Sequence, residues 1–294
     1  MHNSENNVLR QEYLDAIKSY RPMDDTFMRA LFRDSPELVE MFLRTVLKKP
    51  DLKVIQSETQ ADLKRITGSR GLCLDVVATD DSGKKYDIEV QRDASEMKPE
   101  RARYNASAMD VENSWKGMEF EELPETYVIF ITEKDYFERK QPIYSIQRTV
   151  HDNNSPFNDG SNILYVNGEY RDDSKFGKLM HDFNCSEAED MLLPEMAERT
   201  NYLKTNEVEV ENMCRQMQEI KERGIAEGRA EGRVEGRVEG RVEGRAEGIP
   251  IGELKKAKEI VLNLTSMQKD MSVEQLASIA GVSVDQIKEW IEEK

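Results

Sequence analysis

The chain has 294 residues, so we expect one domain of ordinary size together with smaller modules. Its net charge of −16 argues against a protein that coats DNA indiscriminately through cationic side chains. The sequence contains no run of about 18 apolar residues that would predict a membrane span. Residues 1–7 also lack the basic and then apolar pattern of a signal peptide. We therefore expect a cytoplasmic protein that has no membrane partner.

The three cysteines, Cys73, Cys185 and Cys214, lie far apart in the sequence. Their odd number and wide spacing are typical of reduced thiols in a cytosolic protein. The three histidines are also scattered, and no two cysteines are spaced as zinc ligands usually are. The sequence therefore does not predict a zinc site.

Residues 24–49 predict two helices. Asp24 or Asp25 is expected to cap the first helix, and Ser35 followed by Pro36 is a typical start for the second. Both helices carry an apolar stripe that should face a core. The stripes consist of Phe27, Leu31 and Phe32 on the first helix, and Leu38, Met41, Phe42 and Val46 on the second.

A strand at residues 53–58 and a connection at residues 65–71 lead to residues 72–91, which predict a β-hairpin. The turn between the two strands begins at Asp81 and ends at Gly83. A three-residue hairpin loop commonly ends with a residue in the left-handed region, where glycine fits without strain.

That turn pairs Asp80 with Lys84 and so fixes the register of the hairpin. Side chains alternate between the two faces of each strand. On one face, every apolar residue then meets an apolar residue. These pairs are Leu74 with Val90, Val76 with Ile88, and Ala78 with Tyr86.

On the other face of the hairpin, Asp75 falls opposite Glu89, while Asp87 and Gln91 share the face of Glu89. Two facing carboxylates repel each other and destabilise a bare sheet. A divalent cation would remove the repulsion, and oxygen ligands of this kind suit Mg²⁺, with Mn²⁺ as a substitute. Gln91 would then hold an attacking water or a phosphate oxygen. The hairpin alone leaves open the alternative of a solvated face whose charges point apart.

Four basic residues follow the hairpin closely. Their crowding beside Glu89 and Gln91 favours a track for nucleic-acid phosphates, although each of them could equally be a solvent-facing charge. They are Arg92, Lys98, Arg101 and Arg103.

Pro99 opens a helix that is expected to run to about Asn113, with Tyr104, Ala108 and Val111 at helical spacing. Residues 127–132 are almost continuously apolar, which is typical of a strand buried on both faces. Short strands are also predicted at residues 143–150 and 163–166, and residues 176–223 have a helical pattern. The helical pattern favours a layer that covers the core, with a partner surface as the alternative.

Residues 224–248 repeat with a period of four, and glycine recurs from Gly224 to Gly248. An isolated helix of this sequence is poor, because each interior glycine costs roughly 1 kcal/mol relative to alanine. If the segment is helical, however, its Glu and Arg stripes lie nearly opposite, and the two stripes of different chains could pair. The repeat is therefore either a flexible linker or a helix formed on self-association. So regular a repeat also suggests that its copy number varies.

After Pro250 the sequence predicts a helix at residues 252–264 and two more within residues 272–291. Their spacing resembles a helix-turn-helix. The module from Glu253 onward has six basic and eight acidic residues, whereas a helix that reads DNA should be basic. A protein-contact or capping role is therefore favoured. The capping signals are Ser272 with Gln275 and Ser283 with Gln286, on either side of Gly281.

Asp75 and the segment Glu89–Gln91 resemble the core of the PD-(D/E)XK nucleases, with Gln91 where these proteins usually carry lysine. The wider pattern resembles the Rpn family of recombination-promoting nucleases and transposases within that superfamily. The resemblance spans about residues 20–220. The segments that carry it are residues 25–32, 74–78, 87–91, 100–105 and 126–131. No proline precedes Asp75, which departs from the family pattern.

The resemblance implies an α/β fold with a restriction-endonuclease-like core, in which a mixed central sheet is flanked by helices, and a helical C-terminal extension. It implies a Mg²⁺-dependent DNA endonuclease in which Asp75 and Glu89 bind the metal and Gln91 orients water. The alternative is a regulatory protein that keeps the nuclease fold and binds DNA or protein without cutting. We also expect a homodimer, formed through the repeat and the C-terminal helices. The predicted parts are an arm (1–20), a core (21–172), a helical layer (173–223), the repeat (224–249) and an end module (250–294).

Overall fold

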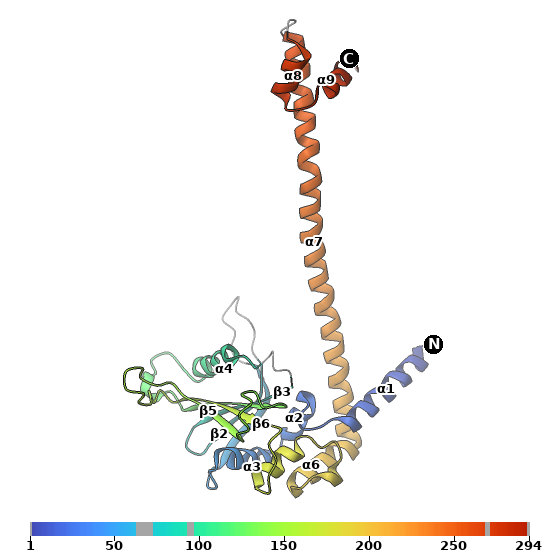
Figure 1. Ribbon diagram of the computed structural model, residues 1–294. Helices are drawn as coiled ribbons and strands as arrows, with labels where there is room; N and C mark the ends of the chain where they lie inside the picture. The colour runs from blue at the N-terminus through green and yellow to red at the C-terminus, as the bar shows by residue number, and fades with distance from the viewer. Residues whose placement is uncertain (1, 63–72, 93–96, 268–270, 293–294) are drawn as a thin grey trace. The chain divides into compact units, whose positions relative to one another are not determined.

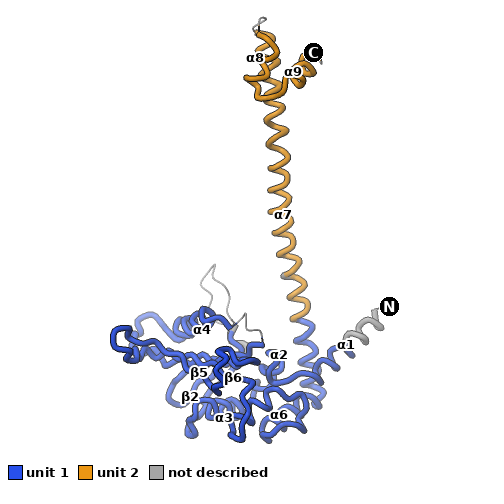
Figure 2. Tube along the Cα trace, in the orientation of Figure 1, with its two compact units in different colours: residues 1–219 blue, residues 220–294 orange. Residues whose placement is uncertain are grey.

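The computed structural model describes the whole chain except residues 1, 63–72, 93–96, 268–270 and 293–294. The connection that we expected at residues 65–71 lies outside the described residues. The chain divides into two compact units, residues 1–219 and residues 220–294 (Figure 2).

The first unit is built on a mixed six-stranded sheet in the order β1-β2-β3-β4-β6-β5 (Figure 1). The neighbours β3, β4 and β6 are parallel, and the other pairs are antiparallel. This architecture confirms the predicted α/β class, although the strand expected at residues 143–150 ends at Ile146. The strands are β1 (Val54–Asp62), β2 (Cys73–Asp80), β3 (Lys85–Gln91), β4 (Thr126–Thr132), β5 (Ile143–Ile146) and β6 (Ser161–Asn167).

The hairpin of β2 and β3 has the register that its turn predicts. Gly83 has a φ of 84°, and its N–H donates to the carbonyl of Asp80 at 3.0 Å. The pairing runs from Thr79 with Lys85, through Ala78 with Tyr86, to Val76 with Ile88. Asp75 and Glu89 are the next residues beyond this last pair.

The alternation of faces does not extend to Leu74. We expected Leu74 to share the face of Val76, but it packs instead in the cluster of Met97. The departure falls next to Asp75, whose carboxylate pairs with Arg29 of α2 (Asp25–Phe32).

Helices cover both faces of the sheet. The larger core lies between α2, α3, α5 and α6 and the face that carries Tyr86, Ile88 and Val90. On the opposite face, α4 packs against Val128 and Phe130 of β4. Figure 1 shows α4 on one side of the sheet and α3 on the other. The N-terminal helix is α1 (His2–Ser19). The helices that cover the sheet, in addition to α2, are α3 (Pro36–Leu47), α4 (Pro99–Glu112), α5 (Lys175–Asp182) and α6 (Pro194–Thr205). Short 3-10 turns lie at Phe120–Glu122 and Ala188–Asp190.

Helix α4 turns a different face to the sheet from the one that its apolar residues predict. Tyr104 and Val111 are 41% and 49% exposed. The buried stripe keeps helical spacing but contains a polar residue, Asn105, which is fully buried. That stripe consists of Ala102, Asn105, Ala106 and Met109.

Helix α7 (Glu207–Met267) is continuous through the four-residue repeat. It also continues through Pro250, where we expected the end module to begin, although proline lacks the N–H that would donate within a helix. A Cβ added at any of the glycines from Gly224 to Gly252 would meet nothing within 4 Å. The glycines therefore leave an open surface along this helix.

The second unit ends in a small packed module. The last turns of α7 pack against α8 (Val273–Ala280) and α9 (Val284–Glu292) around Val261, Ile287 and Trp290. The predicted capping box is present, because the Ser272 hydroxyl accepts from the N–H of Gln275 at 3.3 Å and the Gln275 side chain accepts from the N–H of Ser272 at 3.0 Å. Gly281, with a φ of 68°, ends α8 in the left-handed region.

Candidate active site

Four carboxylates converge at the open end of the hairpin. Asp75 comes from β2, Asp87 and Glu89 come from β3, and Asp25 is the first residue of α2. Asp87 and Glu89 are fully buried, and Asp75 is 8% exposed. Carboxylates are rarely buried together unless cations or hydrogen-bond donors compensate them.

Two arginines supply part of that compensation. Arg29 donates to Asp75 Oδ1 from Nη1 at 3.2 Å and pairs with Asp25 Oδ2 through Nη2 at 2.7 Å. Arg101 of α4 donates from Nη2 to Glu89 Oε2 at 2.8 Å. Two guanidinium charges balance only half of four ionised carboxylates.

Asn105 joins the two acidic residues of β3. Its Nδ2 donates to Asp87 Oδ2 and to Glu89 Oε1, each at 3.0 Å. Gln91, which is 5% exposed, donates from Nε2 to Glu89 Oε2 at 3.4 Å. The fully buried Glu89 therefore accepts from three side chains of β3 and α4.

Three buried oxygens of this cluster have no hydrogen-bond partner among the described residues. They are Asp25 Oδ1, Asp87 Oδ1 and Asn105 Oδ1. A buried polar atom without a partner costs free energy, and such atoms in a native site often mark the place of a ligand or ion. Carboxylate and amide oxygens are the ligands that Mg²⁺ and Mn²⁺ prefer. The donor set therefore fits a hard divalent cation.

The electrostatics of the cluster are consistent with such a cation. Burial, followed by the neighbouring Asp25 and Glu89, raises the pKa of Asp75 well above its ordinary value, against the opposing charge of Arg29. Burial and Glu89 do the same to the pKa of Asp87. Burial also raises the pKa of Glu89, although Arg101 and Asn105 lower it. The raised pKa values disfavour ionisation of all these carboxylates together, and a divalent ion would favour it.

Residues 22–219 match the family model of the PD-(D/E)XK nuclease family transposases. The chain belongs to this family. The match covers about two thirds of the sequence and ends at residue 219, where the first compact unit also ends. It confirms the predicted resemblance. Neither the curated proteins nor the solved structures contain a match to this chain.

The basic residues that we expected to form a phosphate track of this PD-(D/E)XK domain lie in different environments. In the contacts that the structure describes, Arg101 is the one of the four that bonds to a carboxylate of the cluster. Arg92 pairs with Asp24 at 2.7 Å and Glu133 at 3.1 Å. Lys98 is exposed just before α4, and Arg103 is exposed on that helix.

The predicted cap of α2 is absent from the described contacts, because the Asp24 side chain makes no capping bond and Asp25 is already the first helical residue. Asp24 Oδ2 accepts instead from the backbone N–H of Arg21 at 2.8 Å, and Oδ1 pairs with Arg92. Asp24 therefore connects the chain before α2 to Arg92, the residue that follows β3.

The structure brings Asp75, Glu89 and Gln91 of this nuclease-family domain together. Sequence reasoning did not propose Asp25 or Asn105 as site residues. Asp25 carried a usable signal, because it lies four residues before Arg29 on a predicted helix and such pairs face each other. Asp87 had a similar signal, since it shares the strand face of Glu89 and Gln91. Asn105 carried no such signal.

The raised pKa values predict how the stability of the metal-free protein depends on pH. A carboxyl whose pKa is raised in the folded state holds its proton more tightly there than in the unfolded chain. The free energy of unfolding should therefore fall as pH rises from the ordinary carboxylate range near ~4 through the raised pKa. Asp75→Asn removes one such group and should make this fall shallower.

Denaturant unfolding in EDTA across that pH range measures the effect. Because many other carboxylates titrate in the same range, the difference between wild type and variant carries the result. Asp81→Asn, at an exposed position in the turn of the same hairpin, is the matched control and should follow wild type. An Asp75→Asn profile parallel to wild type would contradict the raised pKa.

Proposed function

We propose that this chain is a Mg²⁺-dependent endonuclease that hydrolyses phosphodiester bonds in DNA, in the setting of recombination, mobile elements or defence. The observation that supports it best is the buried carboxylate cluster at Asp75 and Glu89, which has more acidic groups than Arg29 and Arg101 neutralise. Membership of a nuclease family of transposases supports DNA as the substrate.

Asp75 and Glu89 would bind the metal, with Mg²⁺ as the preferred ion and Mn²⁺ as a substitute, and Asp25 and Asp87 would border the site. A bound Mg²⁺ would polarise the scissile phosphate and lower the pKa of a coordinated water. The described helices include none that is both long and apolar enough to cross a membrane. We propose a cytoplasmic location, where DNA would be accessible.

In the commoner PD-(D/E)XK pattern a single lysine lies at the position of Gln91. Here Gln91 would orient the water and Arg101 would supply the positive charge. Gln91 has no charge, but its amide can orient a water beside Glu89. Arg101 already lies beside Glu89 and provides a permanent positive charge, because a guanidinium does not deprotonate in proteins. Such a charge stabilises a transition state in which negative charge grows on the phosphate oxygens.

A nicking assay on supercoiled plasmid DNA tests the proposal. The purified full chain should convert the plasmid to open circles in Mg²⁺ or Mn²⁺, and EDTA should stop the reaction. An Asp75→Asn protein purified in parallel excludes a contaminating nuclease. Cleavage that persists in EDTA, or none in either ion, would contradict the proposal.

The competing candidate is a regulatory protein that binds DNA or a protein partner without cutting. It is favoured by Gln91 in place of lysine and by the ion pairs of Arg29 and Arg101, which already occupy Asp75 and Glu89. A gel shift of DNA in Mg²⁺, without nicking under the same conditions, would support this alternative.

We further propose that the chain forms a homodimer through α7 and the C-terminal helices. The Glu and Arg side chains from Arg229 to Glu247 are exposed, and the glycines of the repeat leave room for a second helix. Full-length protein should therefore self-associate more than a chain that ends at Arg223. The excess should weaken with salt, because exposed ion pairs are screened beyond about 10 Å at 0.1 M.

Sedimentation of the two proteins at low and high salt measures this association. The truncated chain keeps all of the first compact unit, so it should fold and serves as the matched control. Equal masses for both proteins at both salt concentrations would mean that α7 does not mediate association.

A further inference from the structure

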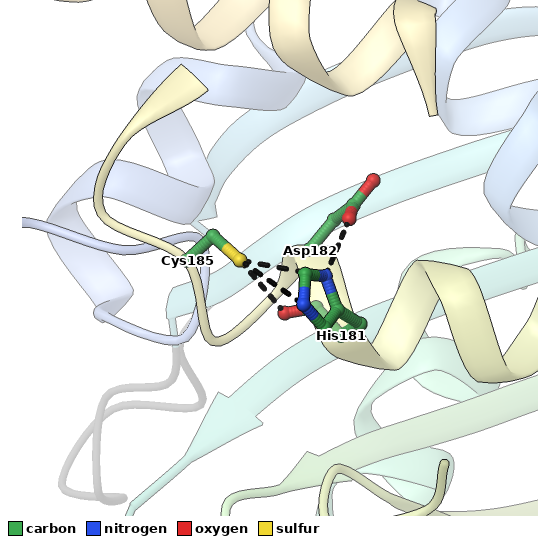
Figure 3. Close-up of side chains that lie close together, drawn as sticks. All are labelled: His181, Asp182 and Cys185. Atoms are coloured by element: carbon green, nitrogen blue, oxygen red, sulfur yellow. Dashed lines mark hydrogen bonds and ion pairs between the residues drawn. The ribbon is translucent and has the colours of Figure 1, made fainter. Parts of the chain in front are cut away.

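A second group of metal-ligating side chains lies at the C-terminal end of α5, with no residue in common with the carboxylate cluster (Figure 3). His181 and Asp182 are the last two residues of α5, and Cys185 follows in the turn after it. His181 Nδ1 lies 3.1 Å from Asp182 Oδ1 and 3.5 Å from Cys185 Sγ. One ligand atom from each residue falls within 4.8 Å of the others.

The two distances from His181 Nδ1 are close to the corresponding edges of a tetrahedral metal site. With metal–nitrogen, metal–oxygen and metal–sulfur bonds of about 2.0, 2.0 and 2.3 Å, the tetrahedral angle separates nitrogen from oxygen by about 3.3 Å and nitrogen from sulfur by about 3.5 Å. The observed separations from His181 Nδ1 are 3.1 and 3.5 Å. A metal on the Nδ1 lone pair would need little movement of Asp182 Oδ1. Cys185 Sγ also lies 3.9 Å from His181 Nε2, beside the imidazole ring, so the partly exposed Cys185 side chain would have to turn toward the metal.

Asp182 is held rigidly for such a role. Its side chain is fully buried, and its two oxygens accept from the backbone N–H groups of Leu192 and Leu193 at 2.7 and 2.8 Å. These bonds orient the carboxylate and leave Oδ1 a second lone pair, which faces His181. A ligand whose own hydrogen bonds fix it in place loses little freedom on binding a metal.

The surroundings of the thiol are mostly negative. The carboxylates of Asp182 and Asp190 interact electrostatically with Cys185, and Arg171 is the cation that opposes them. The carbonyl of His181 lies 3.4 Å from the sulfur, at the helix end where the dipole is negative. His181 and Cys185 are both partly exposed, so solvent and metal ions can reach them.

We propose that His181, Asp182 and Cys185 bind a transition-metal cation of the Zn²⁺ type through Nδ1, Oδ1 and Sγ, with a water as the fourth ligand. On binding, the Cys185 thiol releases its proton to solvent and the resulting thiolate bonds to the metal, while neutral imidazole donates its lone pair. Thiolate and imidazole select such metals over Mg²⁺, which prefers the all-oxygen cluster at Asp75 and Glu89.

A metal here would connect the end of α5 to the segment of Leu192 and Leu193 through Asp182. The sequence did not predict this site, because the usual zinc signal is a pair of cysteines at short spacing. The available signal was instead a histidine and a cysteine four residues apart, His181 and Cys185, which the end of a helix brings to one side.

Cobalt binding to the metal-free full chain tests the proposal. Co²⁺ should be added in the presence of excess Mg²⁺, which occupies the carboxylate cluster. One equivalent should produce the near-ultraviolet thiolate-to-cobalt band and the strong visible bands of a tetrahedral site. Cys185→Ser should lose the near-ultraviolet band, whereas Cys214→Ser, at a buried cysteine outside the group, should keep it.

Zn²⁺ should also raise the melting temperature of wild type and of Cys214→Ser, but not that of Cys185→Ser. His181→Asn is the second variant, and it should weaken Co²⁺ binding at least tenfold even if Cys185→Ser fails to fold. The proposal is overturned if saturating Co²⁺ gives no thiolate band, if the band survives in Cys185→Ser, or if His181→Asn binds Co²⁺ as wild type does. None of these readouts depends on DNA cleavage, so failure of the nuclease proposal would not affect them.

Discussion

Asp75→Asn is expected to abolish DNA nicking while making the metal-free protein more stable at neutral pH. The loss of activity should be at least on the order of 10³-fold, because Asp75 is proposed to hold the catalytic ion. The free energy of unfolding of the metal-free protein should rise. The rise is expected because asparagine needs no proton at a site where burial and neighbouring carboxylates raise the pKa of Asp75.

Plasmid nicking in Mg²⁺ and thermal melts in EDTA at pH 7 measure the two effects on one protein sample. Asp81→Asn, on the exposed turn of the same hairpin, should leave both unchanged. A variant that loses activity and also unfolds more easily would indicate a structural role for Asp75. A variant that cuts as wild type does would remove Asp75 from the site.

The second large effect is expected for Arg101→Met, which keeps most of the side-chain length and removes the charge beside Glu89. We expect a loss on the order of 10²-fold in kcat, the range for removing one group that stabilises transition-state charge. Gln91→Lys in the Arg101→Met background should recover part of that loss, because Gln91 contacts Glu89 Oε2, the same oxygen that Arg101 contacts. Gln91→Ala alone should lose at least about 10²-fold.

Single-turnover nicking of the single and double variants measures this compensation. Arg103→Met is the matched control, since Arg103 is exposed on the same helix. It should change DNA affinity more than the cleavage rate. If Gln91→Lys lowers activity equally in both backgrounds, the two residues do not share a role, and if Gln91→Ala cuts as wild type does, Gln91 has none.

The hairpin shows how far a sequence can determine a site. Gly83 fixes the turn, the turn fixes the register, and the register places Asp75 and Glu89 at the same end of the sheet. The continuous apolar run of β4 likewise indicated its burial on both faces. These features are local, so they can be read from neighbouring residues.

The remaining part of the site depends on contacts between distant segments. Asn105 is polar but occupies a core position of α4, so the pattern of apolar residues predicted that the wrong face of this helix is buried. Its burial is explained by Asp87 and Glu89, which accept its hydrogen bonds from a different element. Arg29 and Arg101 similarly bond to carboxylates that lie 46 and 12 residues away in the sequence. Secondary-structure propensity and hydrophobic periodicity do not predict such pairings between distant residues.

The repeat of α7 has a further geometric consequence, because its four-residue period does not match the 3.6-residue turn of the helix. Four residues advance an α-helix by about 400°, so the Glu and Arg stripes wind around α7 instead of following its axis. A second straight helix would therefore contact each stripe over only a few turns.

Each added repeat would lengthen the helix by about 6 Å and rotate everything beyond it by about 40°. A change in repeat number within the second unit would then alter the direction in which α8 and α9 point, as well as their distance from the start of the repeat. The same direction returns only after about nine repeats, or about 54 Å. Chains that differ by one repeat would thus present the Trp290 module at orientations about 40° apart around the same helix axis.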